Sequence, residues 1–174
     1  MKKIILLRGV TPTGPNRIPK MAYLREILIE VGFENVQTYI QSGNIVFETN
    51  LSDETVRGLV HYTILENIGA DLSVIIKMPE QLAEAVQENP FGNSYDASRV
   101  HLVFTNDKLD TGILKNLAQT DFGDEALYIG SQCLYLYLPR EAKKKRLNTN
   151  FLEKKLGIRA TMRKLSVTSK LCLM

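Results

Sequence analysis

Three segments of the sequence carry side chains that could bind a ligand, and the first is a loop rich in glycine and proline. Residues 10–19 read VTPTGPNRIP, and the basic and small polar residues in and beside them are Arg8, Gly9, Asn16, Arg17 and Lys20. A glycine-containing turn between a strand and a helix can direct backbone N–H groups toward an anion, with help from the helix dipole. The loop has no Walker sequence and no G-x-G-x-x-G, and its prolines lack N–H donors, so a purely structural turn is the alternative.

The second segment is a predicted hairpin turn with an unusual set of polar residues. Its candidate ligand-binding residues are Tyr39, Gln41, Ser42, Gly43 and Asn44. Ser, Gly and Asn are ordinary turn residues, since they tolerate positive φ or bond the local backbone. Gln41 is not a typical turn residue, and Tyr39 adds an aromatic surface. If the first and third strands of this sheet are neighbours, Arg8 and Asn44 lie on adjacent strands.

The third segment is a run of four cations, Lys143, Lys144, Lys145 and Arg146. Between Pro139 and Lys164 ten Lys and Arg face only Glu141 and Glu153, so this stretch carries +8 while the rest of the chain carries −5. Such asymmetry favours attraction to phosphate groups, although a solvated surface is the commoner explanation. Burying an unpaired ammonium group is costly, so we expect the four side chains on an exposed loop.

The sequence shows no catalytic constellation. His61 and His101 stand alone in the two halves, without a triad or metal-ligand spacing. Cys133 and Cys172 adjoin no predicted helix N-terminus that would lower a thiol pKa. No acidic cluster suggests a metal, so we expect no metal site and no cofactor.

Two tyrosines, Tyr135 and Tyr137, alternate with leucines and therefore share one face of a predicted strand. Exposed aromatic residues on such a sheet can stack nucleic-acid bases. The basic-aromatic signature of RNA-recognition modules is absent, and tyrosines at a core edge or a dimer contact are the alternative.

Composition places the chain among ordinary globular proteins. Its 174 residues are 44% hydrophobic and 24% charged. No apolar run approaches the roughly 20 residues of a membrane-spanning helix. Arg8 ends the run Ile4–Leu7, which is shorter than the apolar part of a signal peptide. Two cysteines cannot cross-link a chain of this size, so we expect a reduced, cytoplasmic setting without membrane attachment.

The elements that must position these segments follow one order twice. In the first half the pattern predicts strands at 3–8, 36–40, 44–49 and 72–77, and helices at 20–31 and from Ser52 to Gly69. After a connecting helix at 80–88 and a loop at 89–98, strands are predicted at 100–105, 125–129, 134–138 and 158–162. Helices are predicted there at 108–118, 149–156 and 166–173.

Both halves therefore read β-α-β-β-α-β, which is the ferredoxin-like order. We predict an α+β fold of two related halves packed as one compact unit, with the helices of each half on one face of an antiparallel sheet. The predicted division is 1–78 for the first half, 79–98 for the connecting helix and loop, and 99–174 for the second half with its C-terminal helix.

Three segments together resemble one protein family. They are residues 7–14 (LRGVTPTG) leading to Ile18-Pro19, residues 38–47 (TYIQSGNIVF) and residues 152–163 (LEKKLGIRATMR). They are similar to the bacterial domain-of-unknown-function family numbered 1697 (DUF1697). The resemblance implies two related α+β halves and no established reaction. The sequence departs from the family pattern at Val10–Gly14, where Ile-Asn-Val-Gly-Gly is usual, and after Arg163, where Asn-Trp-Asn-Thr is usual.

Three functions are compatible with these observations. The first is a small binding protein for an anionic ligand, either nucleic acid or a phosphorylated metabolite. The second is an enzyme whose cleft uses Arg8, Gln41, Ser42 and Asn44 on a small polar substrate. The third is a structural or regulatory protein that acts through subunit contacts, with a homodimer as one form.

Overall fold

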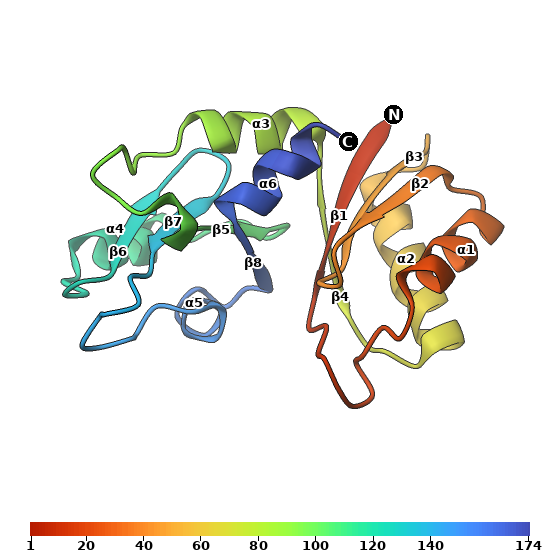
Figure 1. Cartoon of the computed structure of the whole chain (residues 1–174), viewed down its shortest axis with the longest axis horizontal. Coiled ribbons are helices and arrows are strands. Elements are labelled where there is room, and N and C mark those ends of the chain that lie inside the picture. The colour runs from red at the N-terminus through yellow and green to blue at the C-terminus, as the bar shows by residue number, and fades with distance from the viewer. The chain divides into compact units, whose positions relative to one another are not determined.

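The computed structural model describes residues 1–174, and its chain forms two compact units (Figure 1). The first comprises Met1–Pro79 together with Met174, and the second comprises Glu80–Leu173. Each unit contains its own four-stranded antiparallel sheet. Two separate sheets with the same strand order confirm the predicted α+β architecture of two related halves.

The first unit follows the predicted β-α-β-β-α-β order. Its elements are β1 (Lys2–Arg8), α1 (Met21–Glu30), β2 (Glu34–Tyr39), β3 (Asn44–Glu48), α2 (Asp53–Ile68) and β4 (Ser73–Lys77). The strand order is β2-β3-β1-β4. Strand β1 is therefore central: Leu6 pairs with Asn44 on β3, and Arg8 pairs with Ser73 on β4. The expected adjacency of the first and third strands is confirmed.

One face of this sheet packs under α1 and α2. Alternation along the strands sends Ile5 and Leu7 of β1, and Ile45 and Phe47 of β3, into the core with the helices. Phe33, just after α1, stacks on Phe47 with ring centroids 4.1 Å apart. Ile18 of the long loop is also in this core at 1% exposure, so the loop is anchored by its apolar residue.

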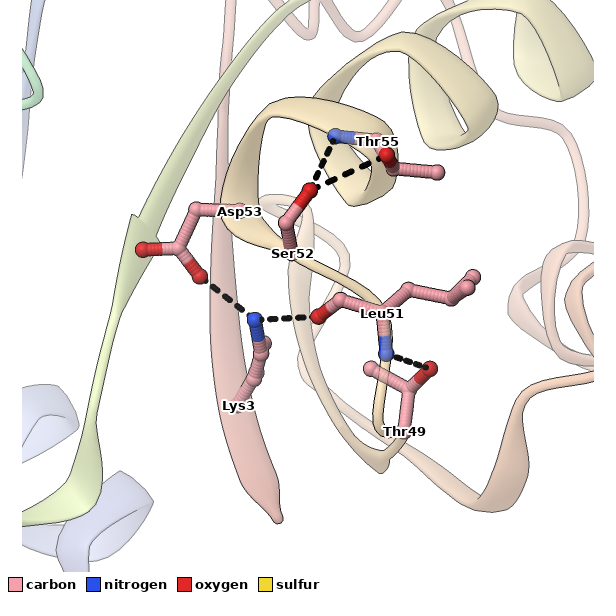
Figure 2. A network of polar contacts seen from close by, with 6 residues as sticks. All are labelled: Lys3, Thr49, Leu51, Ser52, Asp53 and Thr55. Carbon is pink, nitrogen blue, oxygen red and sulfur yellow. Dashed lines mark hydrogen bonds and ion pairs between the residues drawn. The ribbon is translucent and has the colours of Figure 1, made fainter.

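A buried lysine connects this sheet to the start of α2 (Figure 2). Lys3 is 4% exposed, and its ammonium group donates to the carbonyl oxygen of Leu51 at 2.8 Å and to Asp53 Oδ1 at 2.6 Å. Ser52 caps the helix by accepting from the Thr55 N–H. The charge of Lys3 is thus compensated where the strand passes under the helix N-terminus.

The second unit repeats the order after a leading helix. Its elements are α3 (Pro79–Gln87), a 3₁₀ turn (Ala97–Arg99), β5 (Val100–Thr105), α4 (Thr111–Gln119), β6 (Ala126–Ile129), β7 (Leu134–Tyr137), α5 (Thr149–Leu156), β8 (Ala160–Lys164) and α6 (Leu165–Cys172). The strand order β6-β7-β5-β8 matches that of the first unit.

The second sheet differs from prediction because helices cover both of its faces. Leu134 and Leu136 of β7 enter a core with residues of α4 and α5. Tyr135 points to the other face, where its hydroxyl donates to the carbonyl oxygen of Ala85 on α3 at 2.5 Å. Figure 1 shows α3 and α6 on the side of this sheet opposite α5. Helices α3 and α6, which precede and follow the β-α-β-β-α-β series of this unit, supply this second layer.

Two elements begin at least two residues later than predicted, and each shift has an identifiable hydrogen bond behind it. Helix α4 begins three residues later than predicted because Asp110 caps it, accepting from the N–H of Ile113. Strand β8 begins at Ala160, two residues later than predicted, since the N–H of Arg159 instead donates to Asp107 in the loop after β5. No helix of the chain combines the length and the hydropathy needed to cross a membrane.

Candidate functional site

The long loop after β1 folds back on itself. Gly9 and Gly14 have φ of +103° and +83°, values that side-chain-bearing residues rarely adopt. The N–H of Thr11 donates to the carbonyl oxygen of Asn16 at 3.1 Å, and the N–H of Arg17 donates to that of Gly14 at 3.3 Å. These bonds close the loop and project Arg17, whose side chain is exposed.

Asn16 anchors this loop to the rest of the first unit. Its Oδ1 accepts from the N–H of Asp71 at 3.1 Å, just before β4. Because the amide oxygen of Asn16 is engaged in this bond, we assign Asn16 a role in positioning the loop.

The turn between β2 and β3 is tightly packed and strained. Ile40 has φ of +48°, an outlier for a β-branched residue. Gly43 has φ of +81°, and a Cβ there would lie 2.8 Å from Cβ of Leu7. The carbonyl oxygen of Gly43 also accepts from the N–H of Leu7 at 2.9 Å. Only glycine fits at position 43, so this residue shapes the turn.

Asn44 holds the turn from inside the protein. It is fully buried, and its Nδ2 donates to the carbonyl oxygen of Tyr39 at 3.0 Å and to Ser42 Oγ at 2.9 Å. Because Asn44 donates to the Ser42 oxygen, the Ser42 hydroxyl proton is directed away from Asn44.

The loop and the turn meet to form a cleft of about 460 Å³, which we call the loop–hairpin cleft. It is lined by Val10, Thr11, Pro12, Arg17, Ile18, Gln41 and Ser42. Gln41 Nε2 donates to the carbonyl oxygen of Ile18 at 3.2 Å and so joins the two walls. Arg17 is the single charged residue in this lining, and no carboxylate accompanies it.

The structure therefore brings together three of the residues predicted to bind a ligand: Arg17, Gln41 and Ser42. Six other predicted residues of the same region do not line the cleft: Arg8, Gly9, Asn16, Tyr39, Gly43 and Asn44. Lys20 is exposed just before α1 and is also outside the lining. Arg8 alternates with Leu7, so its side chain leaves β1 on the face away from α1 and α2.

Thr11 and the apolar wall of Val10, Pro12 and Ile18 were missed by the sequence analysis. Thr11 is a hydroxyl donor inside a glycine- and proline-rich loop, which is a signal that the sequence did contain. The Thr11 hydroxyl donates to the carbonyl oxygen of Thr13 at 2.7 Å.

The predicted basic run lies on a second cleft, in the second unit. Lys143, Lys144, Lys145 and Arg146 are all exposed on the loop before α5, as predicted. Three of them line a cleft of about 410 Å³ together with residues 121–124, and Lys145 does not. This lining also contains Asp121 and Asp124, so the cations share their cleft with two carboxylates.

Internal carboxylates also hold the backbone of this run. Glu125 is 5% exposed, and its Oε1 accepts from the N–H of Arg146 at 2.7 Å and of Leu147 at 3.0 Å. Asp124 accepts from the N–H of Lys143 at 3.3 Å. The Arg146 guanidinium lies over the Phe122 ring, 5.1 Å from its centroid. The run is positioned by the protein's own acids.

Tyr135 and Tyr137 do share a strand face, but only one of them reaches the surface. Tyr135 is fully buried, and burial raises the pKa of its hydroxyl. The Tyr137 ring packs at 4.8 Å from Tyr95 and 5.6 Å from Phe91, and its hydroxyl accepts from the N–H of Asp96. The pair belongs to the packing of α3 and the 89–98 loop.

The histidine and the two cysteines of the second unit are buried or partly buried. His101 is 8% exposed, and desolvation lowers its pKa. Cys133 is buried, and burial raises the pKa of the Cys172 thiol. No three His, Cys, Asp or Glu side chains gather as a metal site would require.

Comparison with known proteins agrees with this architecture. The model of a protein family described as "Protein of unknown function (DUF1697)" matches residues 1–135. The matched range includes both walls of the loop–hairpin cleft and ends before Arg163, where the sequence departs from the family pattern. The solved structure of a conserved bacterial protein from Streptococcus pneumoniae is 23% identical, with a TM-score of 0.76, over 99% of this chain and 97% of that one. No curated protein matches the chain.

Proposed function

The chain belongs to the DUF1697 family of proteins of unknown function, and we propose from its own geometry that it binds a small anionic ligand in the loop–hairpin cleft. One observation carries the proposal. Arg17 is exposed in this lining, and its guanidinium group has no ion-pair or hydrogen-bond partner within the chain. A guanidinium group offers five N–H donors in a planar fork that fits carboxylate and phosphate oxygens.

The size of the cleft favours a small molecule over nucleic acid. A volume of about 460 Å³ lies within the range of small-molecule sites. Nucleic-acid affinity rests on several cationic contacts to successive phosphates. The lining supplies one cation, which suits one anionic group.

Binding is better supported than catalysis at this cleft. Thr11 and Ser42 are the lining residues with a hydroxyl group, and none of the lining side chains is a general base near neutral pH that could activate one of them. Asn44 is buried in hydrogen bonds, and Arg8 lies outside the lining. Only Gln41 and Ser42 of the four residues in the enzyme hypothesis therefore line the cleft.

A second candidate function is polyanion binding by the run Lys143–Arg146. It is favoured by the exposure of all four side chains. Asp121 and Asp124 line the second cleft, and Lys145 lies outside that lining. This contact would be electrostatic and would weaken steeply with added salt. For either function we propose a reduced, cytoplasmic setting, because two cysteines are too few to cross-link a chain of this size.

The cleft proposal is tested by titrating the ¹⁵N-labelled protein with inorganic phosphate, hexyl phosphate and hexanoate, one at a time. We expect at least one of these anions to shift the amide signals of residues 10–18 and 40–43. The Arg17→Gln variant should lose affinity by about tenfold or more, since hydrogen bonds to charged groups are the stronger ones.

The matched control is Arg25→Gln, which removes an exposed arginine on α1 outside the lining. It should bind like the unmodified protein. Equal affinity in the Arg17 and Arg25 variants, or no shift at the cleft with any of the three anions, would contradict the proposal.

A further inference from the structure

The hairpin of the second unit shows what a serine and a glutamine at such a turn can bind. Between β6 and β7, the Ser131 hydroxyl is 3.2 Å from Glu84 Oε1 and 2.7 Å from Glu88 Oε2. Gln132 Nε2 donates to Glu84 Oε2 at 3.1 Å. One carboxylate, that of Glu84, therefore has each of its two oxygens within hydrogen-bond distance of a different side chain of this turn.

The topologically equivalent hairpin of the first unit carries the same two residue types at its turn. Gln41 and Ser42 line the loop–hairpin cleft. One N–H of the Gln41 amide is used on the carbonyl oxygen of Ile18, which leaves its second N–H for another acceptor. The turn of the second unit faces acidic residues of α3, whereas the turn of the first unit faces the loop that carries Arg17.

We propose that the loop–hairpin cleft takes one carboxylate group on a small apolar body, with Arg17, Gln41 and Ser42 as its donors. This inference rests on the proposed function and specifies its ligand class.

Charge and shape favour a carboxylate over a phosphate. Arg17 supplies one positive charge, which a carboxylate matches, whereas a phosphate monoester carries about −1.5 to −2 near neutral pH. The second negative charge of a phosphate would be partly desolvated in the cleft, where no second cation in the lining compensates it. Val10, Pro12 and Ile18 supply an apolar wall for the carbon chain that bears the carboxylate.

Three ligands with one carbon chain test the assignment: hexanoate, hexyl phosphate and hexanamide, titrated by NMR at pH 7.5. We expect hexanoate to bind about fivefold or more tightly than hexyl phosphate, because an unpartnered charge or polar group is costly in a partly apolar site. The neutral hexanamide should bind more weakly than hexanoate.

Matched serine variants test the assigned donors. Ser42→Ala should weaken hexanoate binding by about tenfold or more, the range expected for one hydrogen bond to a charged group. Ser131→Ala changes the equivalent hairpin of the second unit and should leave hexanoate binding unchanged. Arg17→Lys keeps the charge but loses the planar fork, and it should also weaken binding.

The outcomes separate this inference from the proposed function. Tighter binding of hexyl phosphate at the cleft would overturn the carboxylate assignment and leave the anion site standing. Equal binding of hexanamide and hexanoate, or equal effects of the two serine variants, would also overturn the assignment. No binding of either anion would overturn the carboxylate assignment, and if inorganic phosphate also failed to bind, the proposed function would fall with it.

Discussion

The β2–β3 and β6–β7 hairpins occupy the same place in two sheets of identical strand order, yet their turns have different neighbours. Ser131 and Gln132 contact Glu84 and Glu88 within their own unit. Gln41 and Ser42 open onto a cleft whose single charge is that of Arg17. One fold thus holds a hairpin whose turn contacts two carboxylates of its own unit and another whose turn lines a cleft.

The connections that follow the first strand of each half account for much of this difference. Residues 9–20 separate β1 from α1, and residues 106–110 separate β5 from α4. The short loop carries Asp107 and Asp110, whose carboxylates accept from the N–H groups of Arg159 and Ile113. The long loop contains Arg17 and Lys20 and no acidic residue. The two halves therefore share a sheet topology, and their loops determine which charged groups each half presents.

The largest expected effect separates the two anion-binding hypotheses. The double substitution Lys144→Glu and Lys145→Glu should abolish retention on heparin at low salt and leave hexanoate binding at the first cleft unchanged. Both lysines are exposed, so the melting temperature should not change. Unchanged retention with an unchanged melting temperature would show that the run is only a solvated loop.

A buried acid tests whether the protein itself positions the second cleft. Glu125→Ala should lower the free energy of unfolding by about 2–3 kcal/mol, because it removes the acceptor of two backbone N–H groups. Glu125→Gln retains one acceptor oxygen and should cost less. Chemical denaturation measures both, and an equal loss in the two variants would argue against the hydrogen-bonding role.

A glycine tests how tightly the first hairpin is packed. Gly43→Ala should destabilise the protein by about 1–3 kcal/mol, since a Cβ would overlap Leu7 and the residue has positive φ. The control is Gly58→Ala in α2, where a Cβ meets nothing within 4 Å and should stabilise by about 0.5–1 kcal/mol. Thermal unfolding of the two variants should move in opposite directions.

Ile40 provides a test of backbone strain in the turn of the first hairpin. Ile40 is half-exposed with φ of +48°, so Ile40→Asn should stabilise the protein by roughly 0.5–1 kcal/mol, because asparagine tolerates this conformation. Ile29 has the same 50% exposure but lies in α1. Ile29→Asn should therefore give no gain, and a gain of equal size would contradict the strain argument.

The smallest expected effect compares the buried basic residues of the two central strands. Lys3 pairs with Phe47 in the first sheet, and His101 pairs with Leu136 in the second. Lys3 is compensated by Asp53, whereas desolvation lowers the pKa of His101 below its usual 6.5. A folded-state pKa below the unfolded value means that stability is complete above pH 6.5 and declines as the pH falls further. Unfolding at pH 7.5 and 5.5 should show a smaller decline for His101→Gln than for the unmodified protein.

The sequence predicted the elements because their signals are local. Alternating or continuous apolar residues indicated β1 and β3, and Ser52 and Gly69 marked the two ends of α2. The repeated order of elements predicted both sheets, since short connections leave few topologies for β-α-β-β-α-β. The exposure of the run Lys143–Arg146 also followed from the sequence, because four adjacent cations cannot be buried without partners.

Only the tertiary structure decided which polar residues line the loop–hairpin cleft. Residues 41 and 44 are close in sequence and similar in chemistry, yet Gln41 lines a cleft and Asn44 is buried. That distinction depends on which sheet face each side chain of β3 points to and on where the loop after β1 packs against the turn. No local sequence pattern specifies the position of that loop. The contact of Ser131 with Glu84 likewise joins residues 47 positions apart. The sequence by itself determined the two sheets and the loops that bear charge, while long-range packing determined that Arg17, Gln41 and Ser42 share one cleft.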